Sequence, residues 1–332
     1  MAISFRLLLS LYLVIPLCLL LYCLDTAVFQ HYLHDNLPSK PTNFLLFQIL
    51  FGTPHILASA VLLTTNREYF QVYKRPLAWA TLAIVVIFGV GSLFISYYVF
   101  YIVVAAWTVF HVLKQQHGVV RGLCKLPNWA FNSLLWTSVA AGLMIYIGIF
   151  LHHRLEIEML ETLQHSAEIL TTLLVLLAFY CQRYVPTTFG KTFLWANVFL
   201  VVSSLYFYSE GYHFFAILIP RLVHDATAYI FYVTHDFNRH SAEPKNALYR
   251  FAKRYSISIF VLLPILTFVG AFFLQAYGDM AIEWLTREVF GYEIRKAMTL
   301  GILGYLALIH YFSEAMTWKN GSPYRQFISF SK

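Results

Sequence analysis

Charged residues are scarce in this sequence. Asp, Glu, Lys and Arg make up 12% of its 332 residues and hydrophobic residues make up 59%, whereas soluble domains contain about 25% charged residues. This balance excludes a soluble globular protein. Because backbone groups in lipid must form their hydrogen bonds internally, long apolar runs form helices. We therefore predict an all-α fold: a polytopic membrane helix bundle in which residues 1–332 form a single integral-membrane domain.

Several other signals are missing. The first apolar run, Leu7 to Leu24, has no A-x-A-like cleavage site, so we interpret it as a membrane span and not as a signal peptide. The net charge is +7, but the basic residues lie in loops between apolar runs, where they indicate topology and not a nucleic-acid partner. The cysteines show no CxxC spacing, so we expect all four to be unpaired and to bind no metal: Cys18, Cys23, Cys124 and Cys181.

Ten apolar runs approach the roughly 20 residues that a helix needs to cross a bilayer. With the N-terminus inside, 17 of the 23 lysines and arginines fall in inside segments and five in outside loops, with Arg221 inside a span. Because positive residues are enriched in cytoplasmic loops, this asymmetry predicts about ten spans with both termini in the cytoplasm. We also expect a separate amphipathic surface helix at 154–168. The predicted spans are 7–28, 43–65, 77–94, 97–119, 129–151, 169–182, 192–208, 211–235, 255–275 and 297–318.

Four histidines lie at similar depths in four of these spans. His55, His111, His224 and His310 lie 12 to 14 residues after the start of spans that all run from outside to inside, which corresponds to depths of roughly 18 to 21 Å. Ionisable residues within spans are rare, and by default they indicate a functional site. Residues at equal depths lie side by side when the helices of one bundle run in the same direction. We therefore predict that these four imidazoles bind one metal ion in the cytoplasmic half of the bilayer.

Carboxylates accompany the histidines. Glu314 follows His310 by four residues, so the two side chains share one helix face. Asp225 follows His224 directly, and Arg221, four residues before Asp225, is expected to form an intramembrane ion pair with it. We predict catalytic roles for Asp225 and Glu314, either as groups that orient the histidines or as metal ligands.

Two further histidines lie closer to the cytoplasm, His117 and His235. We predict that they support the first metal or bind a second one. His235 is eleven residues from His224, about 16 Å along a continuous helix. It therefore belongs to a second site only if the helix breaks near Tyr232. The same layer of the bundle holds Gln115 and Asp236.

The ligand type indicates the metal. Imidazole suits iron, copper and zinc, whereas magnesium and calcium prefer oxygen ligands. We therefore expect a transition-metal cofactor, one or two iron ions. A buried iron site in lipid is suited to activating O₂ on an apolar substrate. Aromatic residues make up 18% of the chain, enough to line a cavity for a long hydrophobic molecule.

Four segments of the chain resemble a known family: FGTPH at 51–55, VFH at 109–111, LVHD at 222–225 and LIHYFSEAMTWK at 308–319. In order and style they resemble segments of the Brp/Blh family, membrane carotene-cleaving dioxygenases with a histidine-bound iron. The resemblance implies an iron-dependent membrane oxygenase. The chain departs from the family at Ala228, where the family has a second histidine four residues after the first. The HxxxH and HxxHH boxes of membrane desaturases and hydroxylases do not occur in the sequence.

These observations predict a membrane-embedded, metal-dependent oxidoreductase. We expect a non-haem iron oxygenase, a dioxygenase of lipid metabolism that acts on a lipid or isoprenoid with O₂, through an electron donor that the sequence does not name. We expect it to be a multi-pass protein of the bacterial inner membrane, in contact with membrane lipids. Three alternatives remain open: a proton- or ion-coupled transporter or permease, a membrane haem protein with two histidine ligands, and a structural assembly protein.

Overall fold

The structure is a computed structural model that describes residues 1–38 and 52–331. Helices account for 82% of it, which confirms the all-α class. The chain divides into two compact units, and each is described by itself below. The first consists of Met1–Phe5, Leu45–Phe100 and Thr227–Lys332, and the second of Arg6–Phe44 and Tyr101–Ala226. The prediction of one integral-membrane domain stays a prediction.

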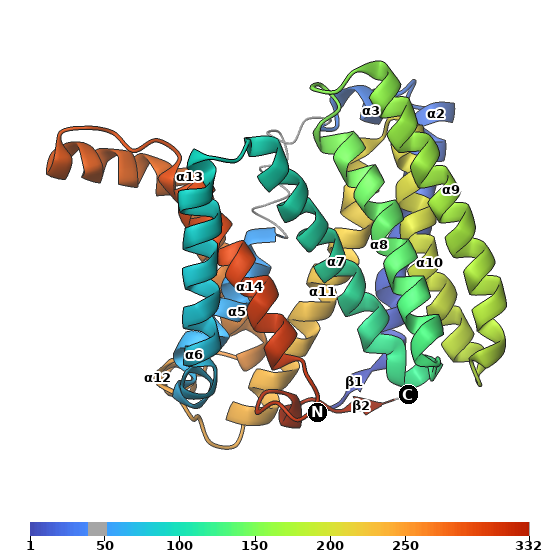
Figure 1. The fold of residues 1–332 in the computed structure, drawn as a ribbon. Coiled ribbons are helices and arrows are strands. Elements are labelled where there is room, and N and C mark those ends of the chain that lie inside the picture. The colour runs from blue at the N-terminus through green and yellow to red at the C-terminus, as the bar shows by residue number, and fades with distance from the viewer. Residues whose placement is uncertain (39–51, 332) are drawn as a thin grey trace. The chain divides into compact units, whose positions relative to one another are not determined.

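The first unit is built around helix α5, which packs against α13 and α14, while α14 also packs against α6 (Figure 1). Gln275 on α13 donates a hydrogen bond to the Thr53 hydroxyl at the start of α5, at 2.7 Å. The hydroxyls of Thr81 and Tyr305 lie 2.8 Å apart and join α6 to α14. The elements of this unit are β1 (Ile3–Ser4), α5 (Thr53–Thr65), α6 (Arg67–Ile84), the π-helix η4 (Val85–Val90), η5 (Gly91–Leu93), the second half of α11 (His213–His240), α12 (Ala247–Arg254), α13 (Ile259–Phe290), the π-helix η7 (Ala297–Ile302), α14 (Leu303–Thr317), η8 (Arg325–Phe327) and β2 (Phe330–Ser331).

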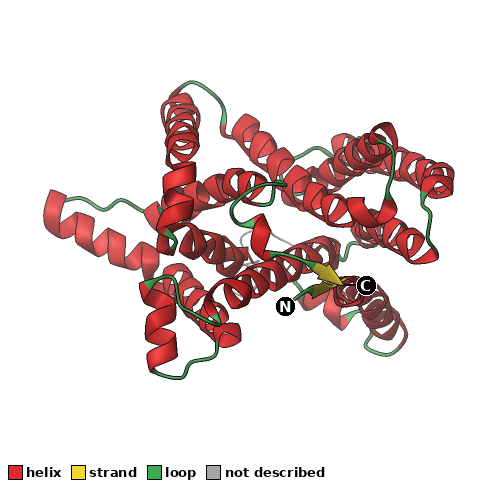
Figure 2. Cartoon of the chain, turned by 90° about the horizontal axis from the view of Figure 1, so that it is seen from below, coloured by secondary structure: helices red, strands yellow, loops and turns green. Residues whose placement is uncertain are grey.

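Both strands of the described chain lie near its ends (Figure 2). They pair in parallel, with Ile3 opposite Phe330 and Ser4 opposite Ser331. The rings of Phe5 and Phe330 stack at 4.8 Å beside them. The two strands therefore bring the two ends of the described chain together. Their placement in the cytoplasm stays a prediction.

In the second unit α8 packs against α9 and α10, α9 also packs against α10, and α2 packs against α10 (Figure 1). Helix α7 comes close to α8 at Gly142, where a Cβ atom would lie 3.0 Å from Val109 and 3.4 Å from Leu113. A larger residue at 142 would therefore push on the turn of α7 that carries His111. The elements of this unit are α1 (Phe5–Ser10), η1 (Leu11–Leu13), α2 (Val14–Ala27), α3 (Tyr32–Asn36), α7 (Tyr97–Cys124), α8 (Asn128–Phe150), α9 (Ile157–Cys181), η6 (Gln182–Tyr184), α10 (Thr188–Ser209) and the first half of α11.

Among the described residues, eight helices are long and apolar enough to cross a membrane, and they correspond to eight of the ten predicted spans. The protein thus has the helices of a multi-pass integral membrane protein. The eight are Phe5–Ala27, Arg67–Val90, Tyr98–Cys124, Asn128–Phe150, Ile157–Tyr184, Thr188–Ser209, His213–His240 and Ile259–Phe290.

The count of ten is not confirmed. The start of the predicted second span, 43–51, lies outside the described residues, and the described part is α5, an apolar helix of 13 residues. The depth predicted for His55 from the start of that span therefore remains untested. The predicted tenth span, 297–318, is made of η7 followed by the 15 residues of α14.

The separate surface helix expected at 154–168 is wrong. Helix α9 begins at Ile157 and continues without a break to Cys181. Its first turn contains Glu158, where the positive end of the helix dipole favours an acidic side chain. The acidic residues are therefore the polar beginning of the spanning helix itself.

Candidate metal centre

The first pair of histidines lies in the first unit, on α5 and α14. His55 follows Pro54 in the first turn of α5, a position where proline costs no hydrogen bond because the first amides of a helix have no partner inside it. Packing of α14 on α5 brings His310 to it. The ring centres of His55 and His310 lie 4.4 Å apart at an angle of 83°, and both side chains are buried.

Glu314 lies one helical turn after His310, on the same face of α14 as the sequence predicts. Its carboxylate oxygens are 3.9 Å from Nε2 of His310 and 4.0 Å from Nε2 of His55. Tyr232 of α11 donates a hydrogen bond from its hydroxyl to the same carboxylate. The carboxylate of Glu314 therefore faces both histidines of the pair and is held in place from a third helix.

Ser59 lies against one ring nitrogen of His310. Its hydroxyl lies 2.9 Å from the carbonyl oxygen of Ile56, which can only accept, and 2.7 Å from Nδ1 of His310. A hydroxyl has one proton, and when Ser59 donates it to Ile56 its oxygen accepts from Nδ1–H of His310. The lone pair of His310 is then on Nε2, the nitrogen beside Glu314. A ligating histidine that donates its other N–H to the protein is typical of metal sites.

The second pair of histidines lies in the second unit, on α7 and α11. The ring centres of His111 and His224 are 4.9 Å apart at an angle of 78°, and both side chains are buried. The geometry of this pair therefore closely resembles that of His55 and His310.

The predicted ion pair beside His224 is confirmed. Nε of Arg221 lies 3.1 Å from Oδ2 of Asp225, one turn apart on α11. The other oxygen of Asp225 lies 3.8 Å from Nε2 of His224. The side chain of Asp225 is 2% exposed, so the arginine offsets a negative charge that would otherwise be costly to bury.

In the first unit His55, His310 and Glu314 are buried donors that could hold a metal ion, and in the second unit His111 and His224 form a buried pair of the same kind. All four predicted histidines and one of the two predicted carboxylates are among these donors. They are chemically suited to a transition metal, since imidazole nitrogen is the commonest protein ligand of such ions.

His235 and His117 lie elsewhere in the structure. Helix α11 is continuous from His213 to His240, so the break near Tyr232 does not occur. Nδ1 of His235 lies 2.9 Å from the Asp236 carboxylate and Nε2 lies 2.7 Å from the Tyr69 hydroxyl. On α7, Nε2 of His117 lies 3.3 Å from the hydroxyl of Ser138 on α8. The metal roles predicted for these two histidines stay predictions, and each has protein partners that account for its burial.

Ser59 and Tyr232 are functional candidates that the sequence did not predict. For Ser59 a signal exists: it follows His55 by four residues, the spacing that places two side chains on one helix face. For Tyr232 no local signal exists, because its partner Glu314 is 82 residues away in the chain. Gln115, one turn after His111, is buried, and in the described part of the chain neither atom of its amide has a hydrogen-bond partner.

The fold and the site together define a helical, multi-pass membrane protein with a buried histidine and glutamate group that could hold a metal. No protein-family model, no curated protein and no solved structure matches the chain. The resemblance to the Brp/Blh family stays a prediction.

Proposed function

We propose that the protein is a membrane-embedded metalloenzyme in which His55, His111, His224 and His310 bind one metal ion, with Glu314 as a fifth ligand or a close partner of the site. The observations that carry the proposal are the buried histidine pair of each unit and the Glu314 carboxylate beside the first pair. An imidazole buried in lipid without a role is costly, and four such groups together with a carboxylate form a typical transition-metal donor set.

The spacing within each pair supports shared coordination. A metal–imidazole bond is about 2.1 Å, and the ring centre lies roughly 1 Å beyond the nitrogen. Two imidazoles on adjacent positions of one ion therefore have ring centres about 4.5 to 5 Å apart, and on opposite positions about 6 Å. The observed 4.4 and 4.9 Å fit adjacent positions. Neither pair has the spacing of the two axial ligands of a haem.

Iron is the proposed metal, and O₂ activation is the chemistry that it would supply when bound. The proposed reaction is oxygenation of a lipid or isoprenoid in a bacterial inner membrane. The surrounding residues have separate tasks: Ser59 orients His310, Tyr232 holds the Glu314 carboxylate, and Asp225 orients His224. Burial of the histidines excludes water from them, as an oxygenase that handles reactive species requires.

The test is the metal content of the protein purified in mild detergent, together with its optical spectrum. We expect about one iron per chain and no Soret band. Loss of the iron on substituting any one of the four histidines is part of the same expectation. A protein that purifies without a transition metal, and does not bind one on reconstitution, contradicts the proposal.

A second candidate function is a proton- or ion-coupled transporter. The ion pair between Arg221 and Asp225 inside α11 favours it, because charged pairs within spans are frequent in proton and ion pathways. Proton uptake by proteoliposomes distinguishes the two functions. Uptake by a metal-free protein would favour the transporter, whereas an iron-loaded protein without uptake would favour the oxygenase.

A further inference from the structure

The short helix α12 (Ala247–Arg254) lies between two candidate membrane spans, α11 and α13. One face of it is buried: Tyr249 and Ala252 pack against Leu262 near the beginning of α13. The span of α11 ends at His240 and that of α13 begins at Ile259. If both spans cross the bilayer, a connection this short keeps α12 near the level where the bilayer meets water.

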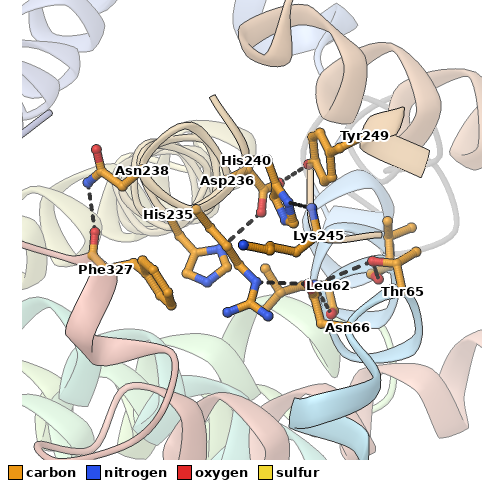
Figure 3. Close-up of polar contacts among 12 residues, drawn as sticks. Leu62, Thr65, Asn66, His235, Asp236, Asn238, His240, Lys245, Tyr249 and Phe327 are labelled. Carbon is orange, nitrogen blue, oxygen red and sulfur yellow. Dashed lines mark hydrogen bonds and ion pairs between the residues drawn. The ribbon is translucent and has the colours of Figure 1, made fainter. Parts of the chain in front are cut away.

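The buried face of α12 is fixed by polar contacts (Figure 3). Asn246 caps the helix by accepting a hydrogen bond from the backbone N–H of Tyr249, at 3.0 Å. The Tyr249 hydroxyl donates to the Asp236 carboxylate, and its ring stacks on His240 at 4.1 Å. Burial and the charge of Asp236 raise the pKa of Tyr249, so it remains a donor at neutral pH. The orientation of the helix is therefore set by the protein before any partner binds.

The opposite face of α12 is basic and aromatic. Arg250, Lys253 and Arg254 are exposed, and in the described part of the chain none of them forms an ion pair with a carboxylate. Phe251 and Tyr255 are 53% and 59% exposed, and their rings lie 4.6 Å apart. Basic side chains with aromatic side chains among them are typical of helices that lie in the headgroup region of a membrane.

We propose that this exposed face of α12 binds the headgroups of anionic phospholipids. Arg250, Lys253 and Arg254 would contact the lipid phosphates, while Phe251 and Tyr255 insert at the boundary between headgroups and acyl chains. Guanidinium groups match phosphate geometry, and each basic residue near an anionic leaflet strengthens binding. The Lys245 ammonium is paired with Glu243 at 2.8 Å and is left out of the binding set.

The test compares the protein in detergent with added phosphatidylglycerol or phosphatidylcholine. Native mass spectrometry counts the retained lipid and thermal unfolding measures stabilisation. We expect retention of phosphatidylglycerol over phosphatidylcholine, weakened by salt. The triple variant Arg250→Gln, Lys253→Gln and Arg254→Gln should bind phosphatidylglycerol at least about tenfold more weakly than the wild-type protein. Gln is a good helix former, so the variant should unfold at the wild-type temperature when no lipid is added.

A matched control removes three other exposed basic residues that form no ion pair in the described part of the chain: Arg67→Gln, Arg154→Gln and Lys191→Gln. It should retain the preference for phosphatidylglycerol. Equal retention of the two lipids by the wild-type protein would overturn the proposal, and so would an equal loss in both triple variants. Stabilisation by inorganic phosphate to the same extent as by phosphatidylglycerol would also overturn it, because the site would then bind an anion and not a lipid. Salt titration of the wild-type protein tests the proposal even if the α12 variant fails to fold.

Discussion

The two histidine pairs have nearly the same ring geometry but different surroundings. His55 and His310 share a carboxylate, Glu314, with oxygens 4.0 and 3.9 Å from their Nε2 atoms. His224, the partner of His111, lies beside Asp225, whose other oxygen is paired with Arg221. The first pair therefore has a carboxylate held by a neutral tyrosine, and the second has one held by a cation.

This difference assigns different tasks to the two carboxylates. Tyr232 donates a hydrogen bond to Glu314 but brings no positive charge to it, which suits a carboxylate that binds a metal cation or offsets its charge. The charge of Asp225 is offset by Arg221, which suits a group that orients His224 and stabilises the helix. We therefore expect substitutions at the first carboxylate to affect mainly metal binding, and at the second mainly stability.

The largest effect should come from the histidines themselves. His310→Ala from the first pair and His224→Ala from the second should each lower metal retention by more than about 100-fold, because one ion needs ligands from both pairs. Metal analysis after dialysis against a chelator measures the retention. His165→Ala, an exposed histidine of α9, is the control and should leave the metal in place. If only one of the two variants, His310→Ala or His224→Ala, lost the metal, the two pairs would not share an ion.

The next largest effect concerns stability. Asp225→Ala removes the carboxylate that pairs with the largely buried Arg221, which should lower the free energy of unfolding by about 3 to 5 kcal/mol. Thermal unfolding in detergent measures the change. The double variant Arg221→Ala and Asp225→Ala should lose less stability than the sum of the single variants, since it leaves no unpaired charge. Glu156→Ala, an exposed residue before α9, should change little. Equal losses of stability in Asp225→Ala and Glu156→Ala would contradict the stabilising role that we assign to the pair of Arg221 and Asp225.

Glu314→Gln tests the carboxylate beside the first histidine pair. The substitution keeps the shape of the side chain and removes its charge, so we expect metal retention to fall by roughly 10 to 100-fold with little change in thermal unfolding of the metal-free protein. The matched variant Asp225→Asn should show the reverse pattern. Unchanged metal affinity in Glu314→Gln would reduce this residue to a packing contact of Tyr232.

The smallest effect is expected for Ser59→Ala. The variant removes the acceptor for Nδ1–H of His310 and should weaken metal retention by about tenfold, the lower end of losses seen for partners of metal ligands. Ser59→Thr keeps a hydroxyl and should restore most of the affinity. A Ser59→Ala protein that keeps its metal as firmly as wild type would show that the orientation of His310 is set by packing alone.

Most of the helices follow from the sequence, because each span is a local run of apolar residues that must form its own hydrogen bonds in lipid. Eight of the ten predicted spans correspond to long apolar helices of the structure. The wrong prediction of a separate surface helix at 154–168 has a local cause. Spans are predicted from runs of apolar residues alone, so the acidic beginning of α9 is assigned to a helix outside the span. Boundaries are the weakest part of such predictions because polar residues are tolerated in the first and last turns.

For the candidate site, the sequence by itself determined the relations within one helix. Arg221 with Asp225 and His310 with Glu314 are four residues apart, and helix geometry alone places them on one face. Only the tertiary structure decided the contacts between helices. Ser59 meets His310 across 251 residues and Tyr232 meets Glu314 across 82. Such partners depend on how helices pack and rotate against one another, and no spacing along the chain encodes that rotation.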